Sequence, residues 1–364
     1  MRIAIISSWP RDPVRGSGTG RYLIDLEAAL RRAGATVLAI GADLDLSDYA
    51  SFVARRMEWN AALPGDTRAC SADILLAIDF DGFALPSGRD GFPPKVVSPQ
   101  GLFAEIAPTE PEPFRSLLLE QARAERRNVA DAALLIVPSA YAAEAVQRHY
   151  EAGAERIEII PHGFDLAEWQ ELLQGADARA RDKGPTILSV ARLYPRKGID
   201  TLLRAFAGLP ARHAAARLRI VGDGIEAPRL RRLAVDLGLE AGDRVRFEGE
   251  IPTRAGLAHL FRQADLFCLP SLQESFGFVF LEAMAAGLPV VAARAGAAGE
   301  VLGEAGTLVA PGSAEDLTRA LARLLDDSAE RTRLGEQGRR RASRFHWEAA
   351  AAAYLARFER VLGS

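Results

Sequence analysis

Cysteine is scarce in this sequence of 364 residues, which contains only Cys70 and Cys268. The two cysteines stand far apart, form no CxxC pair and have no histidine close by in the sequence. This pattern offers neither a disulfide framework nor a zinc-binding motif. It fits a protein of the reducing cytoplasm.

Long uncharged apolar runs are also missing. A helix that spans a membrane needs about 18 apolar residues or more, and no such run free of charge, glycine and proline occurs. The chain opens on an apolar segment, residues 3–7, without the apolar region and small-residue cleavage site of a secretory signal. We therefore expect a cytoplasmic protein, for which a peripheral association with lipid stays open.

An excess of one charge sign is absent as well, because the formal net charge is −3 and the arginine clusters alternate with acids. A nucleic-acid-binding protein would show a basic patch, so we expect no nucleic acid as partner.

Lysine is rare among the basic residues. Of the 45 Lys and Arg residues only Lys95, Lys183 and Lys197 are lysine, which makes each lysine position worth inspecting.

Apolar residues make up 49% of the chain, and a chain of this length exceeds the size at which a single core stops growing, which predicts two domains. Short apolar runs alternate with amphipathic stretches in both halves, a pattern typical of doubly wound α/β domains with parallel sheets. We expect strands at residues 3–7, 36–40, 74–78, 96–98, 133–137 and 157–160, then at 186–191, 218–221, 245–248, 266–269, 290–293 and 307–309. We expect helices at residues 20–33, 113–129, 140–150, 199–209, 227–237, 254–263, 276–286, 314–326 and 347–362.

Residues 161–185 show no strand pattern and end in polar residues with Gly and Pro, which indicates a connection between domains. We expect an N-terminal domain at residues 1–165, a linker at 166–184, a second domain at 185–345, and a last helix at 346–364 that could pack on either domain. Two doubly wound domains that face each other would align the carboxyl ends of both sheets along one cleft, where ligands bind in such folds.

A glycine-rich loop follows the first predicted strand. Gly16, Gly18 and Gly20 could let the backbone approach a phosphate at a helix N-terminus. The spacing is GxGxG and not the dinucleotide-binding GxGxxG, so a flexible surface loop is an equally good interpretation.

Two cations stand at the end of one predicted strand. Arg192 follows the strand at 186–191, and Lys197 precedes the next helix. Surface charges often show such a spacing. The rarity of Lys elsewhere nevertheless favours a diphosphate site, because Lys supplies a compact point charge and Arg a planar fork.

The stretch QESFGFVFLEAMAAGLPVV, residues 273–291, places Glu274 and Glu282 in an otherwise apolar segment. Carboxylates are seldom buried without partners. Either a neighbouring Arg or Lys neutralises them in buried ion pairs, or the hydroxyl groups of a ligand complete their hydrogen bonding. Gly277, in the first turn of the predicted helix, would leave backbone N–H groups free to face an anion.

These motifs together resemble the retaining nucleotide-sugar glycosyltransferases of family 4 (group 1), which have the GT-B fold of two Rossmann-like domains facing a central cleft. The similarity covers nearly all of residues 186–326 through ARLYPRKG, IVGDG, LGLEAGDRVRFEGEIP, ADLFCLPSLQESFGFVFLEAMAAGLPVVAA, GAAGE and GTLVAPGS. It is weaker in the N-terminal half, where the glycine loop, VPSAYAAEAV and IIPHGFD carry it.

The resemblance implies roles for the residues that match the motifs of the family. Arg192 and Lys197 would hold the diphosphate of the donor, Glu274 would contact the donor sugar, and Glu282 would bind the ribose. Further donor-binding positions implied in this way are Gly18, Gly20, Gly222, Ser275, Phe276, Gly277 and Phe278. Cationic side chains and helix dipoles could stabilise the leaving diphosphate, so we expect neither a metal nor another cofactor.

The sequence also departs from the family pattern. Gln100 stands where the family often has His. His162 and the glycine after it stand where the family usually has Asn-Gly. Before Glu300 the family usually has a pair of glycines, whereas this chain has Gly296 followed by Ala. Because Gln cannot exchange a proton near neutral pH, we interpret Gln100 as a hydrogen-bonding contact to the donor sugar. Capping of its loop is the alternative.

Residues 79–81 have the sequence DFD, which matches the Asp-x-Asp metal-binding motif. They follow a predicted strand of the first domain, so we interpret Asp79 and Asp81 as acceptor contacts or as structural residues. Candidate acceptor or cleft residues are thus Asp79, Asp81, His162, Gly296 and Glu300.

The resemblance implies transfer of a sugar from a nucleoside diphosphate sugar to a hydroxyl acceptor. A sugar-nucleotide epimerase of the same fold and a non-catalytic nucleotide-sugar sensor are the alternatives, and a lipid-linked acceptor would bring peripheral membrane association.

Overall fold

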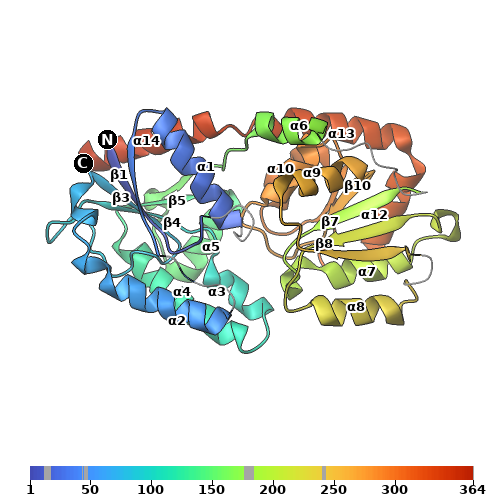
Figure 1. The fold of residues 1–364 in the computed structure, drawn as a ribbon, viewed down its shortest axis with the longest axis horizontal. Helices are drawn as coiled ribbons and strands as arrows, with labels where there is room; N and C mark the ends of the chain where they lie inside the picture. Colours follow the sequence, from blue (N-terminus) through green and yellow to red (C-terminus); the bar gives the residue numbers. More distant parts are fainter. Residues whose placement is uncertain (12–17, 43, 45–47, 176–183, 240–242, 364) are drawn as a thin grey trace. The chain divides into compact units, whose positions relative to one another are not determined.

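The computed structural model describes residues 1–364 except residues 12–17, 43, 45–47, 176–183, 240–242 and 364. The chain forms two compact units (Figure 1). Unit 1 comprises Met1–Gly163 and His346–Ser364, and unit 2 comprises Phe164–Phe345. Of the residues that the sequence analysis assigns to a linker, Leu166–Gly175 form helix α6, whose Trp169 is fully buried within unit 2.

Unit 1 is built on a parallel six-stranded sheet with the order β2-β1-β3-β4-β5-β6. Its strands are β1 Arg2–Ile6, β2 Thr36–Ile40, β3 Ile74–Ile78, β4 Lys95–Ser98, β5 Leu134–Val137 and β6 Ile157–Ile159. Its helices are α1 Gly18–Arg32, α2 Tyr49–Ala62, α3 Phe103–Ile106, α4 Phe114–Asp131, α5 Ala140–Tyr150 and α14 Trp347–Gly363. Helices α1 and α14 lie side by side over one face of the sheet, while α2 and α4 cover the other (Figure 1).

Unit 2 contains a second parallel six-stranded sheet, with the order β12-β11-β10-β7-β8-β9. Its strands are β7 Thr186–Val190, β8 Arg217–Val221, β9 Val245–Gly249, β10 Leu266–Leu269, β11 Val290–Ala293 and β12 Gly306–Val309. Besides α6, its helices are α7 Ile199–Ala207, α8 Ala227–Asp236, α9 Arg254–Gln263, α10 Phe278–Ala285, α11 Ala298–Leu302, α12 Ala314–Asp326 and α13 Ser328–Ala342. Helices α7 and α8 lie on one face of the sheet and α9 and α10 on the other (Figure 1).

The strands form where the sequence predicts them because most are continuous apolar runs. Strands β3, β5, β10 and β11, for example, are buried at every position. Strands buried on both faces are typical of parallel sheets covered by helices on each side. The α/β prediction of two doubly wound domains is therefore confirmed. No helix in the described part of the chain is long and apolar enough to span a bilayer.

Helices α2 and α13 are absent from the sequence prediction. The buried positions of α2 include Arg56 and Asn60, so its inward face does not read as apolar. Helix α13 is strongly charged, and glycines stand among its few buried positions. In both helices, tertiary contacts form a helix that hydrophobic periodicity does not reveal. The helix predicted at 276–286 is shorter than expected, since Gly277 forms its N-terminal cap and α10 begins at Phe278.

Candidate functional site

The strand order of unit 2 fixes where a ligand is expected. The chain proceeds from β7 outward to β8 and β9, and from β10 outward to β11 and β12, so the direction of winding reverses between neighbouring strands β7 and β10. In open α/β sheets ligands bind at the carboxyl ends of the strands at such a reversal. The segments that follow β7 and β10 carry Lys197 and Glu274, which places both predicted residues at this point.

Lys197 and Glu274 form an ion pair. The Nζ atom of Lys197 lies 2.6 Å from Oε1 of Glu274, and the two side chains are only 15% and 12% exposed. The hydroxyl of Ser271 donates a second hydrogen bond to the same carboxylate oxygen at 2.9 Å. A lysine that the sequence analysis assigns to a diphosphate thus contacts the acid assigned to the donor sugar.

The backbone of Glu274 is held by the loop that follows β11. The amide of Ala297 donates to the carbonyl of Glu274 at 2.8 Å. Gly296 has φ +57°, and a Cβ there would lie 2.5 Å from the amide nitrogen of Glu274. Only glycine fits such an approach without moving the backbone. Gly296 therefore acts by allowing close packing behind Glu274.

Arg192 lies just beyond the end of β7, on the same sheet edge as Lys197. Its side chain is 42% exposed, and its guanidinium lies 2.6 Å from the carboxylate of Glu250. Gly222 follows the neighbouring strand β8, and its amide donates to the carbonyl of Gly249 at 2.7 Å. Arg192 and Lys197 thus both lie beyond the carboxyl end of β7, each beside an acid.

Glu282 lies in α10 and also has a cationic partner. The guanidinium of Arg254, the first residue of α9, lies 3.5 Å from its carboxylate, and the Glu282 side chain is 12% exposed. Arg254 also stacks over the ring of Trp169 at 5.0 Å, and the indole of Trp169 donates to the Glu282 carbonyl at 3.0 Å. The ion-pair alternative therefore describes the contacts of both glutamates in this structure, and a ligand contact remains a proposal.

Residues 275–278 form the entry to α10. Gly277, with φ 91°, caps the helix, and Phe276 is buried against the rings of Phe278 and Phe345. Ser275 precedes them, and its hydroxyl accepts from the Gln273 side chain at 3.4 Å. The segment is thus anchored by Phe276 and turns at Gly277.

In unit 1 the carboxylates of Asp79 and Asp81 bind protein groups. Asp81 is fully buried, forms an ion pair with Arg56 at 3.1 Å, and accepts from the side chains of Ser8 and Asn60. Asp79 is also fully buried, and burial raises the pKa of its carboxyl above the usual value. These contacts favour the structural interpretation of both aspartates. In the described part of the chain no group of three His, Cys, Asp or Glu side chains could hold a metal ion.

The loop that carries Gln100 is held between two buried carboxylates. Asp79 accepts from the backbone amide of Gln100 at 2.6 Å and from that of Gly101 at 2.9 Å. Glu125 of α4 accepts from the backbone amide of Phe103 at 3.0 Å and from the hydroxyl of Tyr150. Burial, together with the negative charge of Asp79, raises the pKa of Glu125 to about 8. The loop is therefore rigidly positioned.

The remaining candidate residues lie at the start of α1, in the core of unit 1 and on the surface of α11. Gly18 and Gly20 open α1, whereas Gly16 lies outside the described residues. His162 is packed against the ring of Tyr22, and burial lowers its pKa to about 3, so it is a neutral core residue of unit 1. Glu300 is exposed on α11, where its carbonyl accepts from Arg341 at 2.6 Å.

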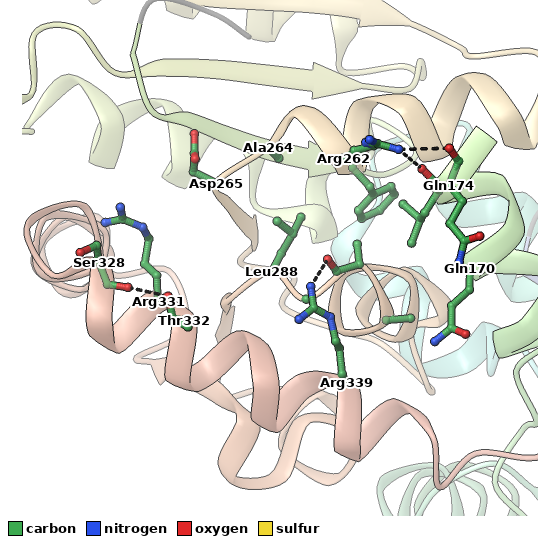
Figure 2. A pocket seen from close by; sticks show the side chains of 15 residues that line it. Gln170, Gln174, Arg262, Ala264, Asp265, Leu288, Ser328, Arg331, Thr332 and Arg339 are labelled. Atoms are coloured by element: carbon green, nitrogen blue, oxygen red, sulfur yellow. Dashed lines mark hydrogen bonds between the residues drawn. The ribbon is translucent and has the colours of Figure 1, made fainter. Parts of the chain in front are cut away.

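A groove in unit 2 lies at the amino ends of the strands, opposite to the ends that carry Lys197 and Glu274 (Figure 2). Asp265 and Leu288, which line it, precede β10 and β11 and so mark the amino ends of the strands. Its arginines bind backbone carbonyls near the C-terminal ends of helices: Arg262 those of α6, Arg331 those of α12, and Arg339 that of Ala286. These contacts offset the dipoles of the helices, so we interpret the arginines of the groove as structural residues.

Comparison with known protein families gives two matches. The model described as glycosyl transferases group 1 matches residues 174–341, and the model described as glycosyltransferase family 4 matches residues 16–168. Among curated proteins, a D-inositol 3-phosphate glycosyltransferase of Rhodococcus opacus is 37% identical over 238 residues, 62% of this chain and 52% of that protein. An MMP alpha-(1->4)-mannosyltransferase of Mycolicibacterium hassiacum is 35% identical over 243 residues, 63% of this chain and 54% of that protein. The matched region thus spans about half the length of these relatives.

Solved structures share the fold over the whole chain. Sucrose-phosphate synthase from Thermosynechococcus elongatus superposes with a TM-score of 0.81 at 24% identity, covering 100% of this chain and 99% of that chain. HepE of Anabaena, solved in complex with UDP and glucose, gives a TM-score of 0.74 at 22% identity, with 99% of each chain covered. Likeness at this identity establishes the fold, and the predicted GT-B fold is confirmed.

Proposed function

This chain belongs to the group 1 glycosyltransferases, and we propose that it transfers a sugar from a nucleoside diphosphate sugar to an acceptor hydroxyl with retention of anomeric configuration. The observation that supports this most is the pair of Lys197 and Glu274 at the point where the winding of the unit 2 sheet reverses. A cation for a phosphate and an acid for sugar hydroxyls are then available within one contact of each other. HepE, a structural neighbour, is described in complex with UDP-glucose.

In the proposed reaction the positive side chains act on the leaving group. As the bond between the anomeric carbon and the diphosphate oxygen breaks, negative charge grows on the diphosphate, and Lys197 and Arg192 stabilise it. Lys197 is mostly shielded from water, which strengthens its interaction with a phosphate. Two fixed cations supply charge that a divalent metal would otherwise bring, so the proposal includes no metal.

The two glutamates bind the donor in this proposal. Glu274 is shielded by its contact with Lys197, and its carboxylate is suited to accept hydrogen bonds from sugar hydroxyls. Glu282 would accept from the ribose hydroxyls, with Arg254 compensating its charge at 3.5 Å. The existing cationic partners offset part of the desolvation cost of these carboxylates before the donor binds.

Proton balance needs no side-chain base at Gln100. The acceptor oxygen bonds to the anomeric carbon on the face from which the diphosphate departs, and the departing phosphate oxygen takes the proton of the acceptor hydroxyl. Gln100 then serves as a contact to the sugar. If the acceptor is lipid-linked, the enzyme would also associate with a membrane surface.

The test begins with donor binding and ends with transfer. A panel of UDP-, GDP- and ADP-sugars is screened by thermal shift, since a donor present at about 100 times its Kd stabilises the fold by roughly 2.7 kcal/mol. The best donor is then incubated with acceptor hydroxyl compounds, and the anomeric configuration of the product is read by NMR. Formation of an epimer of the donor without any acceptor would favour the epimerase. Tight binding with neither transfer nor epimerisation would favour the sensor.

A further inference from the structure

A buried chain of hydrogen bonds in unit 1 ends at the side chain of Gln100. The hydroxyl of Tyr354 in α14 lies 2.7 Å from that of Tyr22 in α1, and the Tyr22 hydroxyl lies 3.2 Å from Oγ of Ser98 at the end of β4. Nε2 of Gln100 lies 2.9 Å from the same Ser98 oxygen. Tyr22, Ser98 and Tyr354 are at most 1% exposed, so water does not complete these bonds.

The direction of the bonds to Ser98 follows from one acceptor. Ser98 Oγ donates its hydrogen to the carbonyl of Ile136 at 2.9 Å, and a carbonyl can only accept. Ser98 Oγ therefore accepts from its other neighbours. One lone pair takes a hydrogen from Gln100, and the other faces the two tyrosines, whose hydroxyls lie 3.2 Å (Tyr22) and 3.4 Å (Tyr354) from Ser98 Oγ and 2.7 Å from each other. One tyrosine donates to Ser98 and the other donates to its partner tyrosine. Burial raises the pKa of Tyr354 to about 12 and that of Tyr22 above its usual value, so both tyrosines keep their hydrogens.

The same reasoning fixes the orientation of the Gln100 amide. The side-chain atom that faces Ser98 lies 2.9 Å from Oγ and 3.4 Å from the backbone carbonyl oxygen of Ser98, and both oxygens act as acceptors. An amide oxygen placed there would meet two acceptors and no donor. The NH₂ group therefore faces Ser98, and Oε1 points away from it. The backbone of Gln100 is tied separately to Asp79 at 2.6 Å.

We propose that Tyr354, Tyr22 and Ser98 are positioning residues that lock the Gln100 amide so that it presents only an acceptor, Oε1, to a hydroxyl of the donor sugar. This inference rests on the proposed function, because it assigns Gln100 to the donor site. An acceptor at this point can receive a hydrogen bond from a sugar hydroxyl and would repel a carboxylate.

Side-chain substitutions test the lock. Tyr354→Phe removes one hydroxyl and keeps the ring, so kcat should fall by roughly 3- to 10-fold, the range for one hydrogen bond. Gln100→Ala should lower kcat by roughly 10-fold or more because the orienting contact is lost. Gln100→His should keep substantial activity, because a neutral imidazole can donate to Ser98 through one nitrogen and accept through the other.

A double-mutant cycle separates positioning from fold stability. In the Gln100→Ala background, Tyr354→Phe should cause no further fall in kcat, while any loss of melting temperature should persist in both backgrounds. The matched control is Tyr141→Phe, which removes another hydrogen-bonded hydroxyl of unit 1, bound to Glu105 at 2.7 Å. Its kcat should equal that of the wild type.

The amide itself supplies a readout without substrate. In ¹⁵N-edited NMR spectra, the side-chain NH₂ signal that disappears in Gln100→Ala should be protected from exchange in the wild type and lose protection in Ser98→Ala. An unprotected signal in the wild type would overturn the lock. Wild-type transfer with unchanged kcat in both Tyr354→Phe and Gln100→Ala would overturn this inference and leave the proposed function intact. Absence of donor binding by the wild type would overturn both.

Discussion

Nζ of Lys197 and Oε1 of Glu274 lie 2.6 Å apart although 77 positions separate the two residues in the sequence. Each lies just beyond a strand, at the one place in the unit 2 sheet where the directions of winding diverge. A donor phosphate bound at Lys197, as proposed, would therefore share this cation with Glu274. In the proposed function the pair would couple the binding of phosphate to the binding of sugar, because a change at either residue alters the charge balance of the other.

Removal of either cation should slow transfer. Lys197→Ala and Arg192→Ala should each lower kcat by about 10²-fold or more, as loss of a charge-stabilising donor does. Steady-state kinetics with saturating donor measure this. Arg212→Ala is the matched control, because Arg212 forms an exposed pair with Asp326 at 2.8 Å elsewhere in unit 2. Turnover at the wild-type level in both single variants would refute the assignment.

Loss of charge at Glu282 should weaken donor binding. Glu282→Gln keeps the shape of the side chain, and donor affinity should fall by roughly 1–3 kcal/mol, the scale for a hydrogen bond to a charged group. Isothermal titration gives the affinity, and thermal melting shows whether the fold is intact. Unchanged affinity combined with a large fall in melting temperature would instead mean that Glu282 serves its pair with Arg254.

Chelation of metals should leave activity intact. We expect the same rate of transfer with and without excess EDTA, because Lys197 and Arg192 carry the charge compensation in the proposal. Loss of activity that Mg²⁺ or Mn²⁺ restores would contradict this. The metal would then have to be sought among oxygens of the donor phosphates, since Asp79 and Asp81 bind protein donors.

Stability should depend on pH through Glu125. Its pKa in the folded state, about 8, exceeds the ordinary value of 4.5, so folding favours the protonated carboxyl. The stabilisation is complete below about pH 4.5 and is lost as pH rises toward 8, by up to about 1.4 kcal/mol per pH unit. Asp79, Arg56 and Tyr150 surround the group, and desolvation outweighs the opposing effect of Arg56.

Glu125→Gln removes this titration. Melting temperatures measured from pH 5 to 9 should fall less steeply in the variant than in the wild type, and the difference between the two curves should stop changing above about pH 8. Glu120→Gln is the control, because Glu120 is exposed on the same helix. Parallel curves for wild type and Glu125→Gln would show that Glu125 is ionised throughout.

The strands and the site region could be predicted from the sequence for one physical reason. Parallel strands buried on both faces leave continuous apolar runs, and the residues just after such runs lie at the ligand-binding edge of the sheet. Lys197 and Glu274 follow this rule. Their direct contact could not be predicted, because it depends on the packing of two loops through Gly296 and Gly198.

Polar contacts in the interior were the main features that sequence reasoning missed. Arg56 and Asn60 face inward from α2 because Asp81 receives them, and a pattern search takes such residues for a solvated surface. Arg254 as the partner of Glu282 carries no local signal either. An apolar helix with isolated acids does indicate that cations lie nearby, but the identity of the cation is a tertiary property.

Helix α14 follows unit 2 in the chain but completes the core of unit 1 through Trp347, Tyr354 and Phe358, which are buried against it. During synthesis, therefore, unit 1 emerges first and is finished last. Until α14 leaves the ribosome, the face of α1 that receives it stays exposed, while unit 2, a continuous segment, can complete its own core. The core of unit 1 can thus be completed only after residues 347–363 have been synthesised.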